Sequence, residues 1–325
     1  MMDARVGIQS SLFILLGFIA TVGNALVTVA IYRMKHRRLV GHYFIASLSL
    51  SDLYFGAFIM PMSVVELHAG ATVTTTPYWC KFTAGLAQTA ILGTSWNLVL
   101  ITIDRFVSIL KPLHYQSWFT ERSVSVAIAC TWFVVIVWSF IPMMGWDANF
   151  NYKRAALTLC IWPLILDNTY FTITLILIFV AISIVAVLQS IIFVVAQKHA
   201  RVIHDNAAMF DIDRNKLHFA KRQRKITKII AVIVGFFMMT YLPWMGILAR
   251  NMWAHEAVNQ IGILIGLLLV YLNSAANPWI YTLSDKKIFS EMKKAIPCIK
   301  NRTDDVQATR MTHRTSTDVE RSNPE

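Results

Sequence analysis

The sequence predicts an all-α membrane protein, built as a seven-transmembrane helix bundle with a short amphipathic eighth helix after the last span. Of its 325 residues, 56% are hydrophobic and only 15% are charged, which is too apolar for an ordinary soluble domain. Seven apolar runs reach the roughly 20 residues that a helix needs to cross the hydrocarbon core. The net charge of +12 is concentrated between alternate runs.

The spans follow one another with short polar connections between them. The first is followed by four basic residues between positions 33 and 38, which stop transfer, so we expect it to remain as a membrane helix. Residues 1–10 are expected to be an N-terminal segment, residues 11–284 the bundle, residues 285–298 an amphipathic helix on the membrane surface and residues 299–325 a disordered tail. The runs cover approximately residues 12–32, 43–65, 82–103, 124–144, 168–197, 229–249 and 257–284.

The basic residues predict the orientation. The segments 33–42, 104–123, 198–228 and 285–325 hold 25 of the 30 Lys and Arg residues. Because such loops stay in the cytoplasm, we expect an extracellular N-terminus and a cytoplasmic C-terminus. The basic charge then indicates contact with the anionic lipid of the bilayer, and no binding to nucleic acid. Cys80 and Cys160 are the only cysteines on the outer side, where the compartment is oxidising, so a disulfide is expected between them.

Asp52 is the one ionisable residue well inside a span. A carboxylate there costs roughly 2.5 to 3.5 kcal/mol on insertion scales, so it must face polar partners. A carboxylate among hydroxyl and amide oxygens suits a small cation or a proton. The alternative is that these groups only bond one helix to another. The candidate partners at matching depth are Asn24, Thr94, Asn97, Asn273, Ser274 and Asn277.

Helix-breaking and charged residues mark further positions. Pro278, in the run Asn277-Pro278-Trp279-Ile280-Tyr281, lacks a backbone donor and permits a kink in the seventh span. Pro61, Pro142 and Pro243 lie in the second, fourth and sixth spans, although membrane helices carry more proline than soluble ones in any case. Asp104 and Arg105 form an adjacent acid-base pair at the inner end of the third span, which could be only a local ion pair.

Together these motifs resemble the rhodopsin-like (class A) G-protein-coupled receptors, over residues 12–298. The third span alone has the family's spacing of twenty-five residues from Cys80 to Arg105. The matching motifs, in order, are Gly23-Asn24, Leu48-Ser49-Leu50-Ser51-Asp52, Cys80, Asp104-Arg105-Phe106, Trp132, Phe237 with Tyr241-Leu242-Pro243, and Asn277-Pro278-Trp279-Ile280-Tyr281.

The resemblance implies a receptor in the plasma membrane that binds an extracellular ligand and activates heterotrimeric G proteins, without catalysing a reaction. It implies no cofactor other than an allosteric Na⁺ ion, with receptor kinase and arrestin as further partners at the tail. Cys298 is placed for lipidation, or is an unmodified thiol. The implied sodium pocket is Asp52, Thr94, Asn273, Ser274 and Asn277. The implied G-protein coupling and activation residues are Asp104, Arg105, Asn277, Pro278 and Tyr281.

The chain departs from the family in the helices that move on activation. Tyr241 and Thr240 replace the usual Trp and Cys before Pro243, Phe106 replaces a Tyr, and the fifth span contains no proline. Many relatives have an acid where this chain has Gln223, within the run Lys221-Arg222-Gln223-Arg224-Lys225. Arg105 then lacks a carboxylate to bind there, so we predict elevated ligand-independent signalling.

Three positions argue against familiar ligand classes. Ala87 stands where bioamine receptors carry an Asp, Tyr271 where opsins carry the retinal Lys, and Leu248 where adenosine receptors carry an Asn. The remaining wall is mostly apolar and aromatic, which suits a small neutral or weakly polar ligand. Several of these residues could instead only pack helix against helix. The expected pocket is Ala87, Gln88, Ile91, Trp162, Tyr241, Trp244, Met245, Leu248, Leu267 and Tyr271; rim residues that could bind a peptide are Glu66, Asp147, Asp167, Arg250 and His255.

Two other functions remain open from the sequence. An ion channel or transporter would use Asp52 as a pathway residue, and an atypical light sensor would hold retinal without a covalent bond. Paired catalytic carboxylates, a nucleophile elbow, a P-loop and a metal-ligand cluster are not visible, so an enzyme is not expected.

Overall fold

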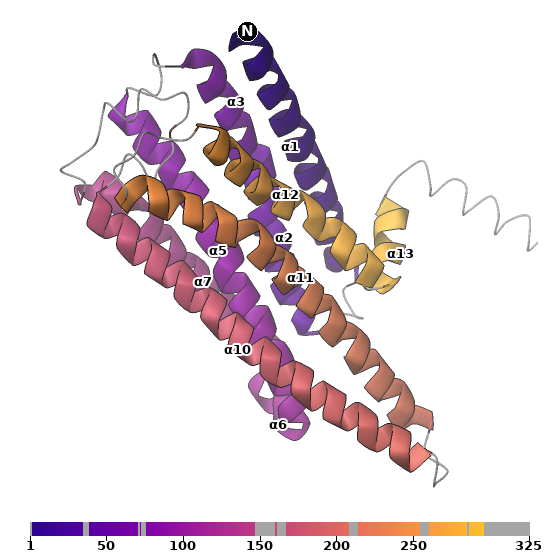
Figure 1. The fold of residues 1–325 in the computed structure, drawn as a ribbon. Helices are drawn as coiled ribbons and strands as arrows, with labels where there is room; N and C mark the ends of the chain where they lie inside the picture. Colours follow the sequence, from indigo (N-terminus) through magenta and orange to yellow (C-terminus); the bar gives the residue numbers. More distant parts are fainter. Residues whose placement is uncertain are drawn as a thin grey trace, which may run out of the picture.

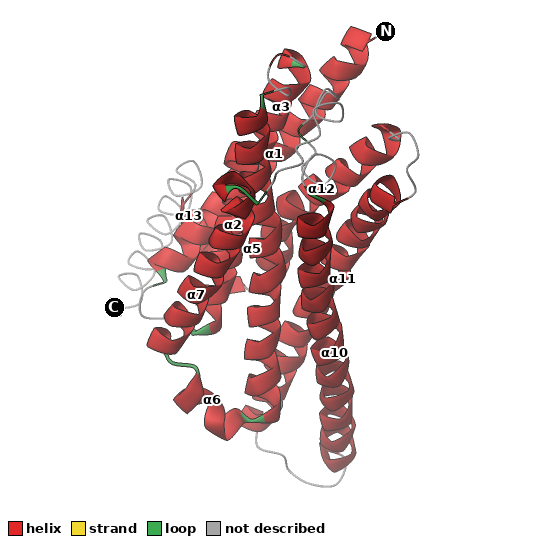
Figure 2. Ribbon diagram, turned by 90° about the vertical axis from the view of Figure 1, so that its left-hand side faces the viewer, coloured by secondary structure: helices red, strands yellow, loops and turns green. Residues whose placement is uncertain are grey.

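In the computed structural model, the residues described are 2–34, 39–70, 72, 76–146, 160, 167–207, 214–253, 260–284 and 286–295. All regular secondary structure within them is helical, as Figure 2 shows. Seven helical segments of this part of the chain are long and apolar enough to cross a membrane. They lie side by side in one elongated bundle (Figure 1), so the predicted fold class is confirmed.

The seven segments match the predicted spans but run past several of their ends. α10 and α11 are each 40 residues long and extend together beyond the rest of the bundle (Figure 1). α1 begins at Met2, inside the segment expected to precede the bundle. The segments are α1 (Met2–Arg33), α2 (Gly41–Tyr54) continued by η1 (Phe55–Ile59) and α3 (Met60–Ala69), α5 (Pro77–Leu110), α7 (Glu121–Phe140) with η2 (Ile141–Met144), α10 (Asn168–Ala207), α11 (Arg214–Trp253) and α12 (Gln260–Ser284).

Short helices join and follow the spans. α6 (Pro112–Trp118) connects α5 to α7, and α7 begins with a capping box in which Thr120 and Ser123 bond each other's backbone N–H groups. α13 (Lys286–Ala295) follows α12 and lies beside α1 (Figure 1). Ile288 and Met292 are buried on one face of α13, while Lys287, Lys293 and Lys294 are exposed. This is the predicted amphipathic eighth helix.

The second span contains a π-helical turn, η1, between α2 and α3. A π turn inserts an extra residue, so every side chain beyond it is rotated relative to an uninterrupted α-helix. Pro61 lies directly after this turn, where its missing N–H is tolerated. Pro243 and Pro278, by contrast, lie inside the continuous helices α11 and α12. The part of the second span that follows η1 is therefore turned in a way that the sequence did not predict.

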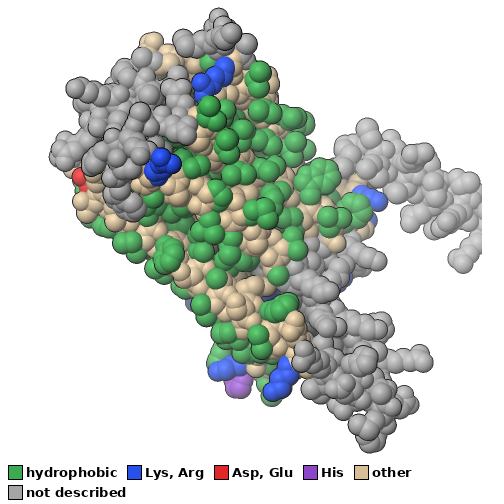
Figure 3. All heavy atoms as spheres, in the orientation of Figure 1, with side chains coloured by type: hydrophobic (Ala, Val, Ile, Leu, Met, Phe, Trp, Pro, Cys, Tyr) green, Lys and Arg blue, Asp and Glu red, His purple; other side chains and the backbone are tan. Residues whose placement is uncertain are grey.

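Small residues allow α1 to approach its neighbours closely. A Cβ atom on Gly23 would lie 2.7 Å from Cγ of Pro278, and one on Gly56 would lie 2.8 Å from Cβ of Ala20. Such contacts between glycines and neighbouring helices are typical of membrane bundles. Large apolar side chains cover the middle of the outer surface, and the visible Lys and Arg side chains lie towards its margins (Figure 3). The surface therefore fits a bilayer.

Candidate functional site

Asp52 lies at the centre of the bundle and is fully buried. Its Oδ2 atom accepts a hydrogen bond of 2.7 Å from the side-chain amide of Asn277 on α12. Its Oδ1 atom is buried without a hydrogen-bond partner among the described residues. A buried polar atom normally has a hydrogen-bond partner, so this oxygen is the atom at the polar centre that could accept a further ligand.

Asn24 on α1 compensates for the proline of α12. Pro278 has no N–H, so it leaves the carbonyl of Ser274, four residues earlier, without its helical donor. The side-chain amide of Asn24 donates to that carbonyl at 3.1 Å and to the carbonyl of Ala20 at 2.8 Å. The motifs in the first and seventh spans thus form one structural unit, and the Oδ1 atom of Asn24 is again buried without a partner in the described residues.

The other predicted members of the centre are connected through intermediaries. The hydroxyl of Thr94 lies 3.2 Å from that of Ser51, the residue before Asp52. The hydroxyl of Thr240 on α11 donates to Oδ1 of Asn273 at 3.4 Å. Asn97 instead donates to the carbonyl of Gly93 in its own helix. The contact between Ser51 and Thr94 was not predicted, because the sequence indicates Ser51 only as part of the motif that precedes Asp52.

At the opposite end of α5 from the disulfide, Arg105 is held by its neighbour Asp104. Its Nε atom donates to Oδ2 of Asp104 at 2.6 Å, and its Nη2 atom forms an ion pair with the same oxygen. Tyr115 on α6 donates its hydroxyl to Oδ1 of Asp104 at 2.7 Å, so both carboxylate oxygens are used. The local ion pair considered from the sequence is therefore present, with Tyr115 as a member that the sequence did not indicate.

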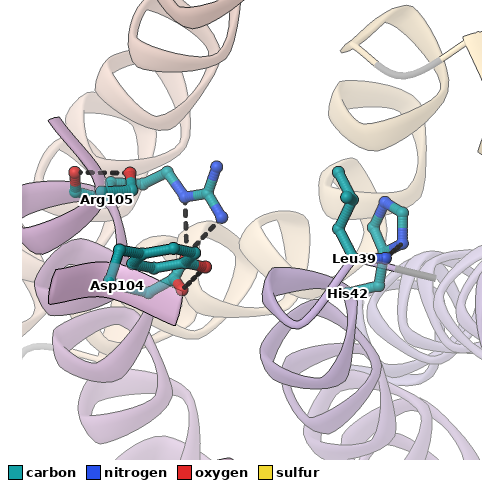
Figure 4. A network of polar contacts seen from close by, with 6 residues as sticks. Leu39, His42, Asp104 and Arg105 are labelled. Atoms are coloured by element: carbon teal, nitrogen blue, oxygen red, sulfur yellow. Dashed lines mark hydrogen bonds and ion pairs between the residues drawn. The ribbon is translucent and has the colours of Figure 1, made fainter. Parts of the chain in front are cut away.

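The environment of this pair is tight. A Cβ atom on Gly41, the first residue of α2, would collide with the Arg105 guanidinium. Figure 4 shows the pair facing Leu39 and His42 at the start of α2, where the Leu39 N–H donates to Nδ1 of His42 at 3.0 Å. Burial, and then the negative charge of Asp104, raise the pKa of the Tyr115 hydroxyl above its usual value. Tyr115 therefore remains a protonated donor.

Of the remaining residues expected to act in G-protein coupling, the structure describes the side chain of Tyr281 but not that of Gln223. Tyr281 is buried at the end of α12, and its hydroxyl has no partner within the described residues. The side chains of residues 221–225 lie outside the described residues, although α11 passes through them. Cys298 and the tail also lie outside the described residues.

A cavity of about 50 Å³ lies near the disulfide end of the bundle, between the second, third, sixth and seventh spans. This volume holds a few water molecules or a small head group, and is below that of a typical drug-sized pocket. Five of the residues expected from the sequence line it: Ala87, Ile91, Trp244, Leu267 and Tyr271. The other lining residues are Phe55, Ile59, Ser63, Glu66, Cys160 and Val270.

The other expected pocket residues lie elsewhere. Gln88 donates to the Tyr170 hydroxyl at 2.6 Å and to the Thr174 hydroxyl at 3.2 Å, so it joins α5 to α10. Tyr241 stacks on Phe237 with ring centroids 4.3 Å apart, deep in the core. Leu248 is fully buried and Met245 is half-buried, and neither lines the cavity. Trp162 lies outside the described residues.

Two polar groups in the cavity wall were not assigned there by the sequence. The hydroxyl of Ser63 lies 2.6 Å from that of Tyr271, whose ring contacts Phe13 and Phe55. Glu66 was expected at the rim, but it is 4% exposed and lines the cavity. An acid near the end of an apolar span was the available signal, but the π turn that directs it inward could not be predicted.

The predicted disulfide between Cys80 and Cys160 is present, with the two Cα atoms 5.2 Å apart. It fixes Cys160, which lines the cavity, to the start of α5. Cys130 is an exposed free thiol on α7.

Comparisons with known proteins agree with this architecture. Residues 23–281 match the family model described as 7 transmembrane receptor (rhodopsin family). Trace amine-associated receptor 9 of Homo sapiens is 27% identical over 285 residues, covering 85% of this chain and 81% of the relative. Adenosine receptor A3 of Canis lupus familiaris is 26% identical, covering 84% and 86%. Alpha-1A adrenergic receptor of Mus musculus is 26% identical, covering 92% and 71%.

The family model covers most of the chain, and its motifs lie at the polar centre, the Arg105 pair and the α12 proline described above. The chain therefore belongs to the rhodopsin family of seven-transmembrane receptors, multi-pass membrane proteins that act as receptors and not as enzymes.

Proposed function

We propose that this receptor binds a small extracellular ligand in the cavity near the disulfide and, in response, activates a heterotrimeric G protein at the Arg105 end. The observation that carries the proposal is the course of α12. Leu267, Val270 and Tyr271 line the cavity, Asn277 donates a hydrogen bond to Asp52, and Tyr281 lies in the last turn of the same helix. A ligand that moves α12 therefore acts on all three regions.

The names of the relatives support a small ligand, since they refer to trace amines, adenosine and adrenergic signalling. The mostly apolar wall supports a ligand with an apolar body, in line with the expected neutral or weakly polar compound. The proposed orientation places the disulfide and cavity outside, and the basic segments and tail in the cytoplasm. Receptor kinase and arrestin are proposed partners of that tail.

The polar centre fits a sodium ion as an allosteric ligand. Asp52 would hold it through the Oδ1 atom that has no partner among the described residues, and the buried side chains of Thr94, Asn273, Ser274 and Asn277 are the proposed further oxygen donors. Oxygen donors that include one carboxylate are what a hard monovalent cation requires. The ion would supply only a positive charge, which stabilises the bundle in the arrangement where these helices lie close together.

Purified receptor in lipid nanodiscs provides the direct test, with GDP release measured on a panel of Gα proteins. We expect basal or ligand-stimulated exchange with at least one Gα, and a loss of about tenfold or more in Arg105→Ala. Arg122→Ala is the matched control, because Arg122 is an exposed arginine near the same end, at the start of α7. If Arg105→Ala acts like wild type at equal receptor concentration, the assigned role of Arg105 is wrong.

The same purified receptor separates the alternative functions. Ion flux after reconstitution into liposomes, without any G-protein response, would favour a channel or transporter, and visible absorbance after addition of retinal would favour a light sensor.

A further inference from the structure

Glu66 is a carboxylate within the second membrane span, in the wall of the outer cavity. It is almost completely buried. Oε1 accepts a hydrogen bond from the indole N–H of Trp79 at 3.2 Å, and Oε2 accepts one from the backbone N–H of Cys160 at 3.0 Å. The carboxylate is thus held by one donor from α5 and one from Cys160, which the disulfide fixes to α5.

Among the described residues, no cation pairs with the Glu66 carboxylate. The indole and the backbone amide that donate to it are neutral, and the ion pairs that join two described residues are Arg105 with Asp104 and Lys294 with Glu291. A carboxylate has about four lone-pair positions, so two donors leave room for another. An ionisable group in a membrane span without a counter-charge in the described part of the chain is a candidate to bind a charged ligand.

The walls around Glu66 indicate which kind of cation would bind. Phe55, Trp244 and Tyr271 present aromatic rings to the same cavity, with Ile91 and Leu267 between them. Aromatic faces attract organic ammonium groups, and the combination of rings with one carboxylate is typical of their binding sites. A metal ion would need about six oxygen ligands, more than the Glu66 carboxylate and the hydroxyls of Ser63 and Tyr271 supply, and those two hydroxyls already lie 2.6 Å from each other. The small volume of the cavity fits an ammonium head group on a short apolar stem.

From this geometry we propose that Glu66 is the anchor for an organic monoamine, whose ammonium group pairs with the carboxylate while its apolar body contacts Trp244 and Leu267. Ala87, which stands where bioamine receptors place their acid, lines the same cavity. The anionic partner is therefore on the second span and not on the third. The inference rests on the proposed role of the cavity as the ligand site, and it replaces the expectation of a neutral ligand with a cationic one.

Binding is tested separately from signalling, on purified full-length receptor in nanodiscs. Thermal unfolding is followed with increasing benzylamine or cyclohexylamine, and with benzyl alcohol or cyclohexanol as neutral compounds of matched shape. A ligand that binds the folded receptor raises the unfolding temperature with its concentration, which gives an apparent Kd. We expect the two amines to stabilise the wild-type receptor and the alcohols not to do so at equal concentration.

Glu66→Gln tests the anchor itself. Removing one partner of a buried charge pair should raise the apparent Kd of each amine by about 30-fold or more. Glu121→Gln is the matched control, since Glu121 is an exposed glutamate at the start of α7, outside the cavity. It should leave the apparent Kd unchanged. If Glu66→Gln does not fold, the comparison of amine with alcohol on wild-type receptor decides the question alone.

Three results would overturn the inference: equal stabilisation by amines and alcohols, an unchanged amine Kd in Glu66→Gln, or no stabilisation by either amine up to saturating millimolar concentrations. An unchanged Kd with a lower unfolding temperature would assign Glu66 only the structural role of holding Cys160. Failure of the proposed function looks different, because amines would then bind through Glu66 without any GDP release from any Gα.

Discussion

The hydrogen bond from Tyr115 to Asp104 gives a quantitative prediction for ligand-independent activity. In this structure the Tyr115 hydroxyl and the Arg105 guanidinium share the Asp104 carboxylate. Tyr115→Phe removes only the hydroxyl. If the arrangement shown is the inactive one, the substitution weakens the hold on Asp104 and favours the state in which Arg105 is released.

The size of the effect follows from the geometry. A hydrogen bond of 2.7 Å to a carboxylate contributes about 1.5 to 3 kcal/mol when it is buried. Tyr115 is half-buried, so water can replace part of this bond and about 1 kcal/mol is a reasonable value. That free energy changes the ratio of the two states by about fivefold. Basal exchange should therefore rise by up to about fivefold while the active state remains the minor one.

The assay is basal GDP release in nanodiscs at matched receptor concentration, with Tyr78→Phe as the control. Tyr78 is 79% exposed near the start of α5, at the disulfide end, so loss of its hydroxyl should have no effect. Because the pKa of Tyr115 is raised above that of a free tyrosine, its hydroxyl remains protonated between about pH 6 and 9. The ratio of variant to wild type should thus be constant over this range. Unchanged or lower basal exchange in Tyr115→Phe would refute the reasoning.

Three further substitutions test other parts of the bundle. Gln223→Glu restores an acid at the inner end of the sixth span and should lower basal exchange, whereas a receptor already silent and unaffected by the change would contradict the predicted constitutive activity. Gly23→Ala should destabilise the receptor by about 1 to 3 kcal/mol, because its Cβ would lie 2.7 Å from the ring of Pro278. Gly246→Ala is the control and should leave the stability unchanged, because nothing lies within 4 Å of the added Cβ. Equal unfolding temperatures for the two variants would show that α1 moves without cost to accommodate the methyl group. Cys80→Ser should lower both surface expression and ligand affinity. Normal ligand binding by the variant, which lacks the disulfide, would argue against a role for the disulfide in shaping the cavity.

The contacts that could be predicted from the sequence are those for which the alternatives carry a high free-energy cost. A buried carboxylate must have polar partners, so the association of Asp52 with Asn277 could be expected from depth alone, and the structure contains it. The disulfide was predictable because only two cysteines fall on the side that the basic residues predict to be extracellular. The length of α10 and α11 was not, because an apolar run ends at the membrane whereas the helix continues into the polar segment.

The cavity was harder because position along a helix does not determine which neighbour a side chain faces. Gln88 lies one residue from Ala87 but bonds to α10 instead of lining the cavity. Glu66 was misplaced at the rim for a different reason, the π turn η1. No periodicity in the sequence indicates such a turn, yet it changes the direction of every residue that follows in the second span.

The position of the π turn also bears on how the two ends of the receptor communicate. η1 separates Asp52, at the polar centre, from Ser63, whose hydroxyl lies next to that of Tyr271 in the cavity. The second span and α12 are therefore in contact at two levels, through Ser63 with Tyr271 and through Asp52 with Asn277. A ligand that separates the first pair rotates or shifts α12 against a helix that is already irregular at η1. We expect the resulting strain to fall on the hydrogen bond between Asn277 and Asp52, at the residue directly before Pro278, which gives a physical route from the cavity to Tyr281 without movement of Asp52 itself.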